Sequence, residues 1–349
     1  MTSRERWLAL LELRSPDRIP TDMWATGEVY EKLRRDLECD TDENIWELLH
    51  VDRPLAIGPV CRLNHHPDDP QADIWGIRHQ TIDYETGAYS ELAHSPLANV
   101  TTVQEIEAYR WPNPGDFDYA PVTEAAAAQD GTRVIHSCGH EPFLLYCALR
   151  GLEQGLEDMI LNPDICDAAL AHINDFMYER NRRTFEAADG VVDTTYIAED
   201  LGSQTGPLFS LAHYRRFLLP AQVRMADLAR EYGIHIMYHT DGSAVDFLPD
   251  LIGKVGIEIL NPIQWRCPGM EREKLVREFG NDVIFHGAMD NQQTMPFGTV
   301  DDVIAEVKEN IEIFSGCRWI CAPCHNLQAV SPTENIVSMY ETIHELGAL

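Results

Sequence analysis

The sequence predicts an α/β fold, a closed (β/α)8 TIM barrel. Three observations predict it. From about residue 190 onward, short apolar runs typical of strands alternate with segments of helical period, which implies parallel strands. Polar residues stand at the ends of five of these runs, as expected where barrel chemistry converges from several strands. No glycine-rich phosphate fingerprint follows an early strand, which disfavours an open dinucleotide-binding sheet.

The clearest predicted strands lie in the second half of the chain, and each ends in a polar residue or cluster. They are 191–200 (VVDTTYIAED), 234–239 (IHIMYH), 257–261 (IEILN), 282–286 (DVIFH) and 318–325 (RWICAPCH). Earlier strand candidates are 18–24 (RIPTDMW) and 132–138 (TRVIHSC). We expect residues 50–110 to form an irregular or β-rich excursion, and residues 1–349 to form a single barrel domain with extra amino-terminal segments.

Segments with apolar residues at helical spacing separate these strands. They cover residues 213–233, 244–256 and 299–314. The run SPTE signals the closing helix: Ser331 is expected to cap it, Pro332 to occupy its first turn and Glu334 to complete a capping box. Strands and helices therefore alternate to the end of the chain.

Composition and charge exclude several classes of function. The chain has 349 residues, of which 44% are hydrophobic, enough for a large core. Its 27 basic and 57 acidic residues give a formal net charge of -30, and such a surface repels nucleic-acid phosphates and anionic lipid. No run approaches the roughly 20 apolar residues that cross a bilayer. We expect a cytoplasmic protein that binds neither nucleic acid nor membrane, with its nine cysteines as reduced thiols.

The run IMYHTDGS ends a predicted strand in two side chains of ligand type. His239 and Asp241 are two positions apart, so they point the same way if the extended geometry persists. The later run CAPCHN adds Cys321, Cys324 and His325 at the end of another strand. Zinc accepts thiolate, imidazole and carboxylate, so these groups favour a zinc site with one position open for substrate. Buried structural cysteines are the alternative, because a single CxxC is a weak metal signal.

Other polar groups at strand ends are candidates for proton transfer or substrate binding. Glu199 and Asp200 are adjacent acids after a strand, so at least one faces the barrel mouth, with a solvated loop carboxylate as the alternative. His286 and Asp290 follow another strand, and their alternative roles are a packed histidine and a turn residue. His140 belongs to a further cluster of histidines, whose spacing is only a weak indication of a site.

Three tryptophans are candidates for the wall of a substrate pocket. Trp24, Trp75 and Trp265 could contact a flat or quaternary-amine substrate through their ring faces. Packing in the core is the alternative role for each of them.

Several blocks of the sequence, in order, resemble the uroporphyrinogen decarboxylase-like superfamily, and specifically its branch of corrinoid-dependent methyltransferases. The blocks are YIAEDLGSQTGPLFS, YHTDGSAVDFLPDLI, ILNPIQ, FHGAMDNQQTMPFGT and APCHNLQAVSPTENIVSMYE. The resemblance covers nearly all of the chain and is strongest from Glu141 onward. It implies a (β/α)8 barrel with its active site at the carboxyl ends of the strands. It also implies a homodimer, because members of the family commonly dimerise.

The chain departs from true uroporphyrinogen decarboxylases where they bind porphyrin. Those enzymes carry an arginine-rich segment of the type RQAGRY, whereas the matching region here reads PTDMWATGEVYEKL, so a polyanionic substrate would lack its clamp. The methyltransferase branch pairs an HxC segment with a later cysteine, matched here by His239, Asp241, and Cys324 or the adjacent His325. Asp241 in place of the first cysteine makes the site harder, which favours an ether or amine methyl donor over a thiol.

The resemblance therefore implies a zinc-dependent methyltransferase, or demethylase, that moves a methyl group from a small methylated substrate to the corrinoid of a separate protein. The implied zinc ligands are His239, Asp241 and Cys324. The catalytic candidates are Glu199, Asp200, His286 and His325. The substrate-binding candidates are Trp24, His140, Asn261, Gln264 and Asp290.

Two other functions compete with this one. A decarboxylase or lyase that acts on a small carboxylic acid without metal would use His325 with Asp200 or Glu199 to handle protons. A barrel that binds a ligand without turnover is the second alternative. Bound metal separates the first interpretation from both.

Overall fold

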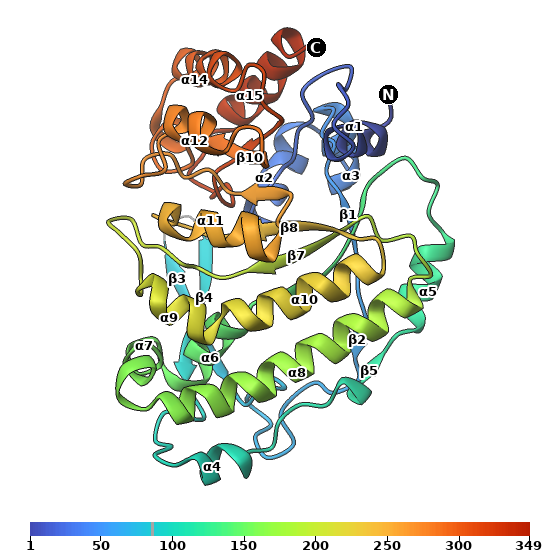
Figure 1. Ribbon diagram of the computed structural model, residues 1–349. Helices are drawn as coiled ribbons and strands as arrows, with labels where there is room; N and C mark the ends of the chain where they lie inside the picture. Colours follow the sequence, from blue (N-terminus) through green and yellow to red (C-terminus); the bar gives the residue numbers. More distant parts are fainter. Residues whose placement is uncertain (85–86) are drawn as a thin grey trace.

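The computed structural model describes residues 1–84 and 87–349 and contains a curled sheet of seven parallel strands with helices around it (Figure 1). The strands follow one another around the sheet in chain order. They are β1 (Leu55–Ile57), β6 (Ile135–His140), β7 (Thr194–Ala198), β8 (His235–His239), β9 (Ile259–Asn261), β10 (Ile284–Met289) and β11 (Trp319–Pro323). Parallel pairing in chain order requires a crossover outside the sheet after each strand.

An extended segment before β1 closes the ring between the last strand and the first. Cys321 N donates to Pro20 O at 2.9 Å and Asp22 N donates to Cys321 O at 3.0 Å, which pairs this segment in parallel with β11. On its other side, Asp52 N donates to Thr21 O at 3.0 Å, shortly before β1 begins. The fold is therefore a (β/α)8 barrel in which the eighth position is held by a few backbone bonds rather than by a full ladder.

Helices make the crossovers, and α8 and α10 lie side by side on one flank of the sheet (Figure 1). Between the strands from β6 onward lie α6 (Pro142–Arg150), α7 (Leu152–Leu161), α8 (Pro163–Ala187), α9 (Leu211–Phe217), α10 (Leu219–Glu231), η2 (Val245–Phe247), α11 (Leu248–Asp250), η3 (Leu251–Val255), α12 (Arg272–Phe279), α13 (Thr294–Phe297) and α14 (Val300–Ile313), and α15 (Thr333–Leu346) closes the chain. Before β6 lie α1 (Ser3–Leu11), α2 (Gly27–Asp36), α3 (Asp42–Leu48), β2 (Val60–Cys61), β3 (Arg78–Tyr84), β4 (Gly87–His94), α4 (Val103–Glu107), η1 (Pro114–Asp116), β5 (Phe117–Asp118) and α5 (Ala120–Ala127). Among the described helices, none is long and apolar enough to cross a membrane.

The interior of the barrel changes from apolar to polar along its axis. At the amino ends of the strands, side chains of α1 and the inward strand positions form one apolar cluster. Its buried members are Trp7, Leu10, Leu11, Val134, Met237, Ile259, Ile284 and Ile320. Toward the carboxyl ends, the inward positions are instead Asn261 on β9 and His286 on β10, both buried. Since a barrel interior is normally filled by branched apolar layers, this polar layer marks the functional end.

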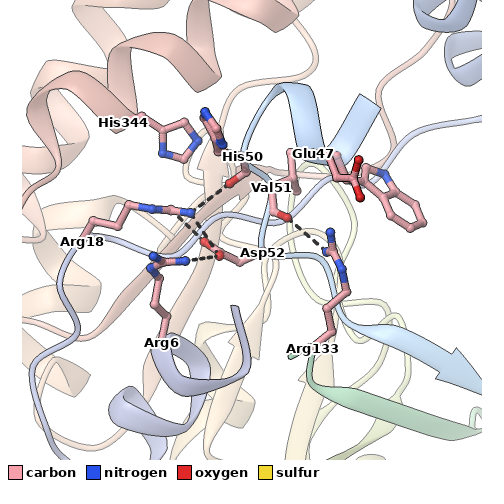
Figure 2. A pocket seen from close by; sticks show the side chains of 9 residues that line it. Arg6, Arg18, Glu47, His50, Val51, Asp52, Arg133 and His344 are labelled. Carbon is pink, nitrogen blue, oxygen red and sulfur yellow. Dashed lines mark hydrogen bonds and ion pairs between the residues drawn. The ribbon is translucent and has the colours of Figure 1, made fainter. Parts of the chain in front are cut away.

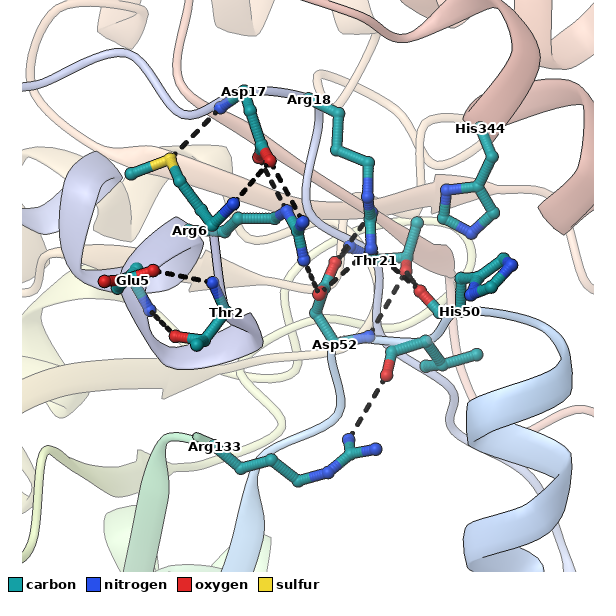
Figure 3. A network of polar contacts seen from close by, with 12 residues as sticks. Thr2, Glu5, Arg6, Asp17, Arg18, Thr21, His50, Asp52, Arg133 and His344 are labelled. Atoms are coloured by element: carbon teal, nitrogen blue, oxygen red, sulfur yellow. Dashed lines mark hydrogen bonds and ion pairs between the residues drawn. The ribbon is translucent and has the colours of Figure 1, made fainter. Parts of the chain in front are cut away.

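A polar network fastens the amino terminus to the apolar end of the barrel (Figure 3). Asp52, only 2% exposed, accepts from Arg6 Nη1 at 3.0 Å and pairs with Arg18 Nη1 at 2.8 Å. Arg6 Nε also binds Asp17 at 2.7 Å, and the Met1 amino group binds the same carboxylate at 2.8 Å. The buried carboxylate thus has two cationic partners, as a buried charge requires. The network holds α1 in place across the barrel end.

The predicted alternation of strands and helices is confirmed. Four of the six ranges that begin at residue 132 or later contain an observed strand, and the other two, 132–138 and 282–286, overlap β6 and β10, which run on to His140 and Met289. The range 18–24 contains the extended segment that closes the ring. The expected excursion over 50–110 contains the antiparallel hairpin β3–β4, and residues 85–86 within it lie outside the described residues.

The predicted helical segment after β7 is divided in two, and the prediction for the closing helix needs correction. The segment 213–233 is two helices, because Leu218 separates α9 from α10 and a proline stands in the first turn of α10. The capping prediction for the closing helix is wrong: α15 begins at Thr333 with Pro332 at the N-cap, and Ser331 Oγ has no partner among the described residues. Lys32 Nζ holds the carbonyl of Ser331, which keeps this residue in the turn before the helix.

The loops after β7 and β8 touch backbone to backbone beside the polar end of the barrel. Gly242 has a φ of +74°, and a Cβ built there would lie 2.5 Å from the carbonyl carbon of Gly202. Ser243 N donates to Ser203 O at 2.9 Å across the same contact. Only glycine fits both the left-handed backbone and the close approach. The contact fixes the position of Asp241, which precedes Gly242.

Replacing Gly242 by alanine should lower the free energy of unfolding by at least about 2 kcal/mol, because the new Cβ is strained by the positive φ and meets the Gly202 backbone. Gly206→Ala is the matched control, since this position in the β7 loop has nothing within 4 Å. It should cost less than about 0.5 kcal/mol. Urea unfolding of both variants measures the difference, and equal losses would contradict the close contact.

Candidate metal centre

Three side chains of ligand type converge at the carboxyl end of the barrel. His239 ends β8, Asp241 lies in the loop after it, and His325 follows β11, with one ligand atom of each within 4.8 Å of the others. His239 Nε2 lies 3.7 Å from Asp241 Oδ1, and His325 Nε2 lies 3.5 Å from Asp241 Oδ2. Their side chains are 10%, 24% and 38% exposed in that order. The group therefore faces the barrel mouth.

The electrostatics of this group favour a bound cation. Burial lowers the pKa of His239 and of His325, although nearby carboxylates oppose the shift, so both imidazoles keep a free lone pair at neutral pH. Burial raises the pKa of Asp241 to about 6, and the charge of Asp200 adds to the shift. Two neutral imidazoles and one carboxylate form a donor set that suits zinc.

Asp22 supplies a buried negative charge beneath the group. Its Oδ2 accepts from His286 Nε2 at 3.0 Å and from Trp24 Nε1 at 2.8 Å, and its Oδ1 accepts from Met23 N at 2.8 Å. Burial raises its pKa, but the bond from His286 and the charge of Arg53 outweigh burial and lower the pKa to about 2. The carboxylate is therefore ionised and can only accept hydrogen bonds.

A chain of hydrogen bonds connects Asp22 to His239 of the ligand group. Asn261 Nδ2, an amide donor, lies 2.7 Å from His286 Nδ1, so Nδ1 accepts and the ring proton lies on Nε2, which donates to Asp22. The amide oxygen of Asn261 then accepts from His239 Nδ1 at 2.6 Å. The proton of His239 is thereby held on Nδ1, and its lone pair lies on Nε2, toward Asp241. A metal-ligating histidine needs this arrangement.

Neighbouring side chains orient the rest of the group. Gln264 Nε2 donates to Asp241 Oδ1 at 2.9 Å, and Gln264 Oε1 accepts from Gly242 N at 2.8 Å. Asp241 N donates to Asp200 Oδ1 at 3.3 Å, which places this second carboxylate beside the group. Asp200 and Gln264 thus lie beside the group, and their predicted catalytic and substrate-binding roles stay predictions.

Cys324, an expected ligand, lies outside the group. Its Sγ donates to Ile263 O at 2.9 Å, it is 3% exposed, and burial raises its pKa well above the usual value for a thiol. Of the two neighbours that the sequence left open, the structure brings His325 to His239 and Asp241. We therefore take His325 as the third ligand candidate.

Glu199, an expected catalytic acid, is engaged in holding a helix. Its two carboxylate oxygens accept from Phe143 N at 2.7 Å and Leu144 N at 2.9 Å, at the first turn of α6. It is 2% exposed. Burial raises its pKa well above the usual value, although the two backbone bonds favour the ionised form. Its catalytic role stays a prediction, and His286 is linked to the ligand group by its hydrogen bond with Asn261 and by the ring of Trp24.

The remaining substrate-binding candidates are divided between the site and its surroundings. Asn261 belongs to the hydrogen-bond chain described above. His140 Nε2 binds Asn174 Oδ1 on α8 at 3.0 Å, and Asp290 binds Arg266 Nε at 2.6 Å. Substrate contact by these two residues stays a prediction.

Of the three candidate tryptophans, one lies at the ligand group. Trp24 stacks on His239 with ring centroids 5.5 Å apart and planes 12° apart. Trp75 packs edge-on against Phe176 at 4.8 Å, and Trp265 has an arginine on its ring at 4.3 Å. Sequence reasoning missed Asp22, because Arg18 and Thr21 make the run RIPTDMW polar at other positions too, so no local signal sets this acid apart.

A wider hollow, about 510 Å³ in volume, lies at the opposite end of the barrel (Figure 2). Its lining includes Arg6, Arg18 and Arg133, but their donors are largely committed. Arg6 and Arg18 bind Asp52, and Arg133 Nη1 donates to the carbonyl of Val51 at 3.2 Å. The hollow therefore belongs to the structural network at the amino terminus, and the ligand group at the mouth is the candidate site.

Comparisons with known proteins agree with this fold. The family model described as uroporphyrinogen decarboxylase (URO-D) matches residues 80–346. A methyltransferase from Methanosarcina mazei has the same fold, with a TM-score of 0.70 and 18% identity over 99% of each chain. A B12-independent methionine synthase from Shewanella sp. W3-18-1 in complex with selenomethionine gives a TM-score of 0.44 and 10% identity, over 94% of this chain and 96% of that one. No curated protein sequence matches the chain.

Zinc binding should depend on His325 and not on Cys324. His325→Ala, like His239→Ala, should reduce bound zinc from about one per chain to a small fraction, because each removes a nitrogen ligand from a three-residue group. Cys324→Ala is the matched control and should keep its zinc, since the thiol is bonded to a backbone carbonyl. Metal analysis of the purified variants gives the answer, and the reverse pattern would assign the site to Cys324.

Asp22→Asn should weaken zinc binding about 10- to 100-fold, as loss of a partner behind a metal-ligating histidine does. It should also cost about 2 kcal/mol of stability at pH 7, because the pKa of Asp22 is lowered from 3.8 to about 2. A lowered pKa means that this stability is present above about pH 4 and is lost as pH falls toward 2. The difference between wild type and variant should shrink over that range.

Asp227→Asn is the control for this prediction, because Asp227 is 62% exposed on α10. It should change neither zinc affinity nor the pH dependence of unfolding. Equal zinc affinity in Asp22→Asn and wild type would refute the role of the hydrogen-bond chain.

Proposed function

The chain belongs to the uroporphyrinogen decarboxylase family, and within it we propose a zinc-dependent methyltransferase that takes a methyl group from a small methylated ether or amine. The observation that carries the proposal is the convergence of His239, Asp241 and His325 at the barrel mouth. The likeness in fold to a methyltransferase from Methanosarcina mazei supports it. The proposed acceptor of the methyl group is a corrinoid carried by a separate protein.

Zinc held by these three residues would act as a Lewis acid on the ether oxygen or amine nitrogen of the methyl donor. Asp22 fixes the tautomer of His239 through His286 and Asn261, so that Nε2 presents its lone pair without a competing proton. His286 is therefore a positioning residue in this proposal.

Asp200 is proposed to handle the proton of the leaving group. Its Oδ1 accepts from Asp241 N at 3.3 Å, and its Oδ2 has no partner among the described residues. A carboxylate oxygen at the rim can hold or release a proton as the demethylated product leaves. His325, the most exposed member of the group, lies on the side from which a corrinoid protein would approach.

Purified protein with zinc should transfer methyl groups from small methyl ethers or methylamines to cob(I)alamin or a corrinoid protein. A chelator, His325→Ala or Asp241→Ala should each reduce the rate at least about 100-fold, because the Lewis acid is lost. Cys324→Ala should stay within a few-fold of wild type. Spectroscopic detection of methylcobalamin measures the reaction. Methyl transfer that a chelator leaves intact would refute the zinc dependence, whereas no methyl transfer together with chelator-resistant decarboxylation of a small acid would favour the decarboxylase or lyase.

A further inference from the structure

Four hydrogen-bond donors beside the candidate metal centre already have acceptors within the protein. Trp24 Nε1, Asn261 Nδ2 and Gln264 Nε2 each donate to a side chain, at 2.8, 2.7 and 2.9 Å in that order. The hydroxyl of Tyr196 donates to the carboxylate of Glu141. A substrate that offered only acceptor atoms would therefore have to compete with bonds that the protein already makes.

Two carboxylates in the same region are open to further donors. Asp200 is partly exposed, and its Oδ2 has no partner among the described residues. Glu141 is also partly exposed, and the Tyr196 hydroxyl uses only one of the several lone pairs of its carboxylate. The region is therefore rich in acceptors, and a molecule bound there gains most by bringing hydrogen-bond donors.

Glu141 lies near the ligand group, because both of its neighbours touch that group. Tyr196 on β7, which donates to Glu141, has its ring centroid 5.6 Å from that of His239. Asp200, whose charge adds to burial in raising the pKa of Glu141, accepts from Asp241 N at 3.3 Å. Glu141 thus brings a further carboxylate to the group from the end of another strand, β6.

The carboxylate of Glu141 has no ion pair among the described residues. Arg180 is the cation whose charge reaches it, and this charge lowers the pKa of Glu141 less than burial and the charge of Asp200 raise it. The Arg180 guanidinium is held elsewhere, since its Nη2 donates to Gly139 O at 2.9 Å and its Nε donates to Asn181 Oδ1 at 3.3 Å. A half-buried carboxylate without a partner favours a positively charged or donor-bearing ligand.

The rings of Trp24 and Tyr196 are a second, independent indication of the substrate. Their centroids are 6.3 Å apart, and both residues are partly exposed although they lie in the barrel interior. Trp24 also stacks on His239, so its ring lies beside the ligand group. Aromatic faces attract the methyl groups around a positive nitrogen. Rings and carboxylates together suit a methylated amine, whereas a simple ether offers neither a donor nor a positive charge.

We infer that the substrate is a methylated amine with at least one N–H, and that Glu141 and Asp200 accept hydrogen bonds from its nitrogen. The inference rests on the proposed function and narrows its substrate from ethers and amines to amines such as dimethylamine. Simple ethers are disfavoured because they bring no donor, and quaternary ammonium ions are disfavoured because they have no N–H.

Such an amine reaches the mouth as its ammonium ion at neutral pH, and the two carboxylates attract this cation. One N–H bond then breaks and the proton passes to water, which leaves a lone pair on the nitrogen. In dimethylamine the remaining N–H is free to donate to a carboxylate, while the lone pair is available to the zinc of the proposed function.

The test is a calorimetric measurement of binding to the zinc-loaded protein. The ligands are dimethylamine, 1,2-dimethoxyethane and tetramethylammonium, and dimethylamine, which alone has an N–H, should bind most tightly. Glu141→Gln should weaken its binding about 10-fold, the worth of one hydrogen bond to a charged group, and should leave the affinity for dimethoxyethane unchanged. Glu153→Gln is the matched control, because Glu153 is exposed on α7, and it should keep the wild-type affinity.

A second variant tests the position of Glu141 rather than its charge. Tyr196→Phe keeps the ring beside His239 and removes the hydroxyl that holds Glu141. It should weaken dimethylamine binding about fivefold, the worth of one neutral hydrogen bond, with zinc content unchanged. The inference would be overturned if dimethoxyethane or tetramethylammonium bound as tightly as dimethylamine, or if both variants kept the wild-type affinity for dimethylamine.

The same titrations on metal-free protein separate this inference from the proposed function. Because the acceptors belong to the protein, dimethylamine should still bind more tightly than dimethoxyethane without zinc, and Glu141→Gln should reduce this preference. Equal affinities in the metal-free wild type would count against the inference. Selective binding of the amine without methyl transfer to cob(I)alamin would count against the proposed function alone.

Discussion

The ionised carboxylate of Asp22 is the constraint on which the candidate site depends. It can only accept hydrogen bonds, and this fixes the donor and acceptor at each later step through His286 and Asn261 to His239. Neutral histidines could otherwise adopt either tautomer. With the carboxylate in place, the nitrogen lone pair of His239 faces Asp241, where a metal would be held. A single buried charge thus sets the chemistry of an imidazole three hydrogen bonds away.

The backbone pairing of the barrel is irregular around Asp22. The closing segment pairs with β11 at Cys321, but at Met23 the pairing gives way to side-chain contacts, because Tyr30 and Arg53 donate to the Met23 carbonyl. The loss of a regular ladder leaves Asp22 with backbone and side-chain donors on both oxygens. The eighth position of the barrel is therefore irregular where it supplies polar contacts, and regular pairing is kept by the seven strands of the sheet.

Much of the fold could be predicted from the sequence, because apolar runs with polar ends report directly on strands buried on both faces. Within the site, His239 and Asp241 could be predicted from their spacing of two. The choice between Cys324 and His325 could not, since neighbours at a strand end point in different directions and residue type alone favours the thiol. Asp22 could not be predicted, because its role depends on a hydrogen bond with His286, which is 264 residues away in the sequence. Local pattern carries no information about such a partner.

The closing segment also limits when this site can form during biosynthesis. Tyr340 OH donates to the carbonyl of Asp22 across 318 residues, and the bonds to Cys321 span nearly as much chain. An emerging polypeptide therefore exposes the closing segment without its partners until β11 and α15 have left the ribosome. A metal ion at the candidate site would bind only after this step, since the segment that carries Asp22 pairs with β11 and His325 follows the same strand.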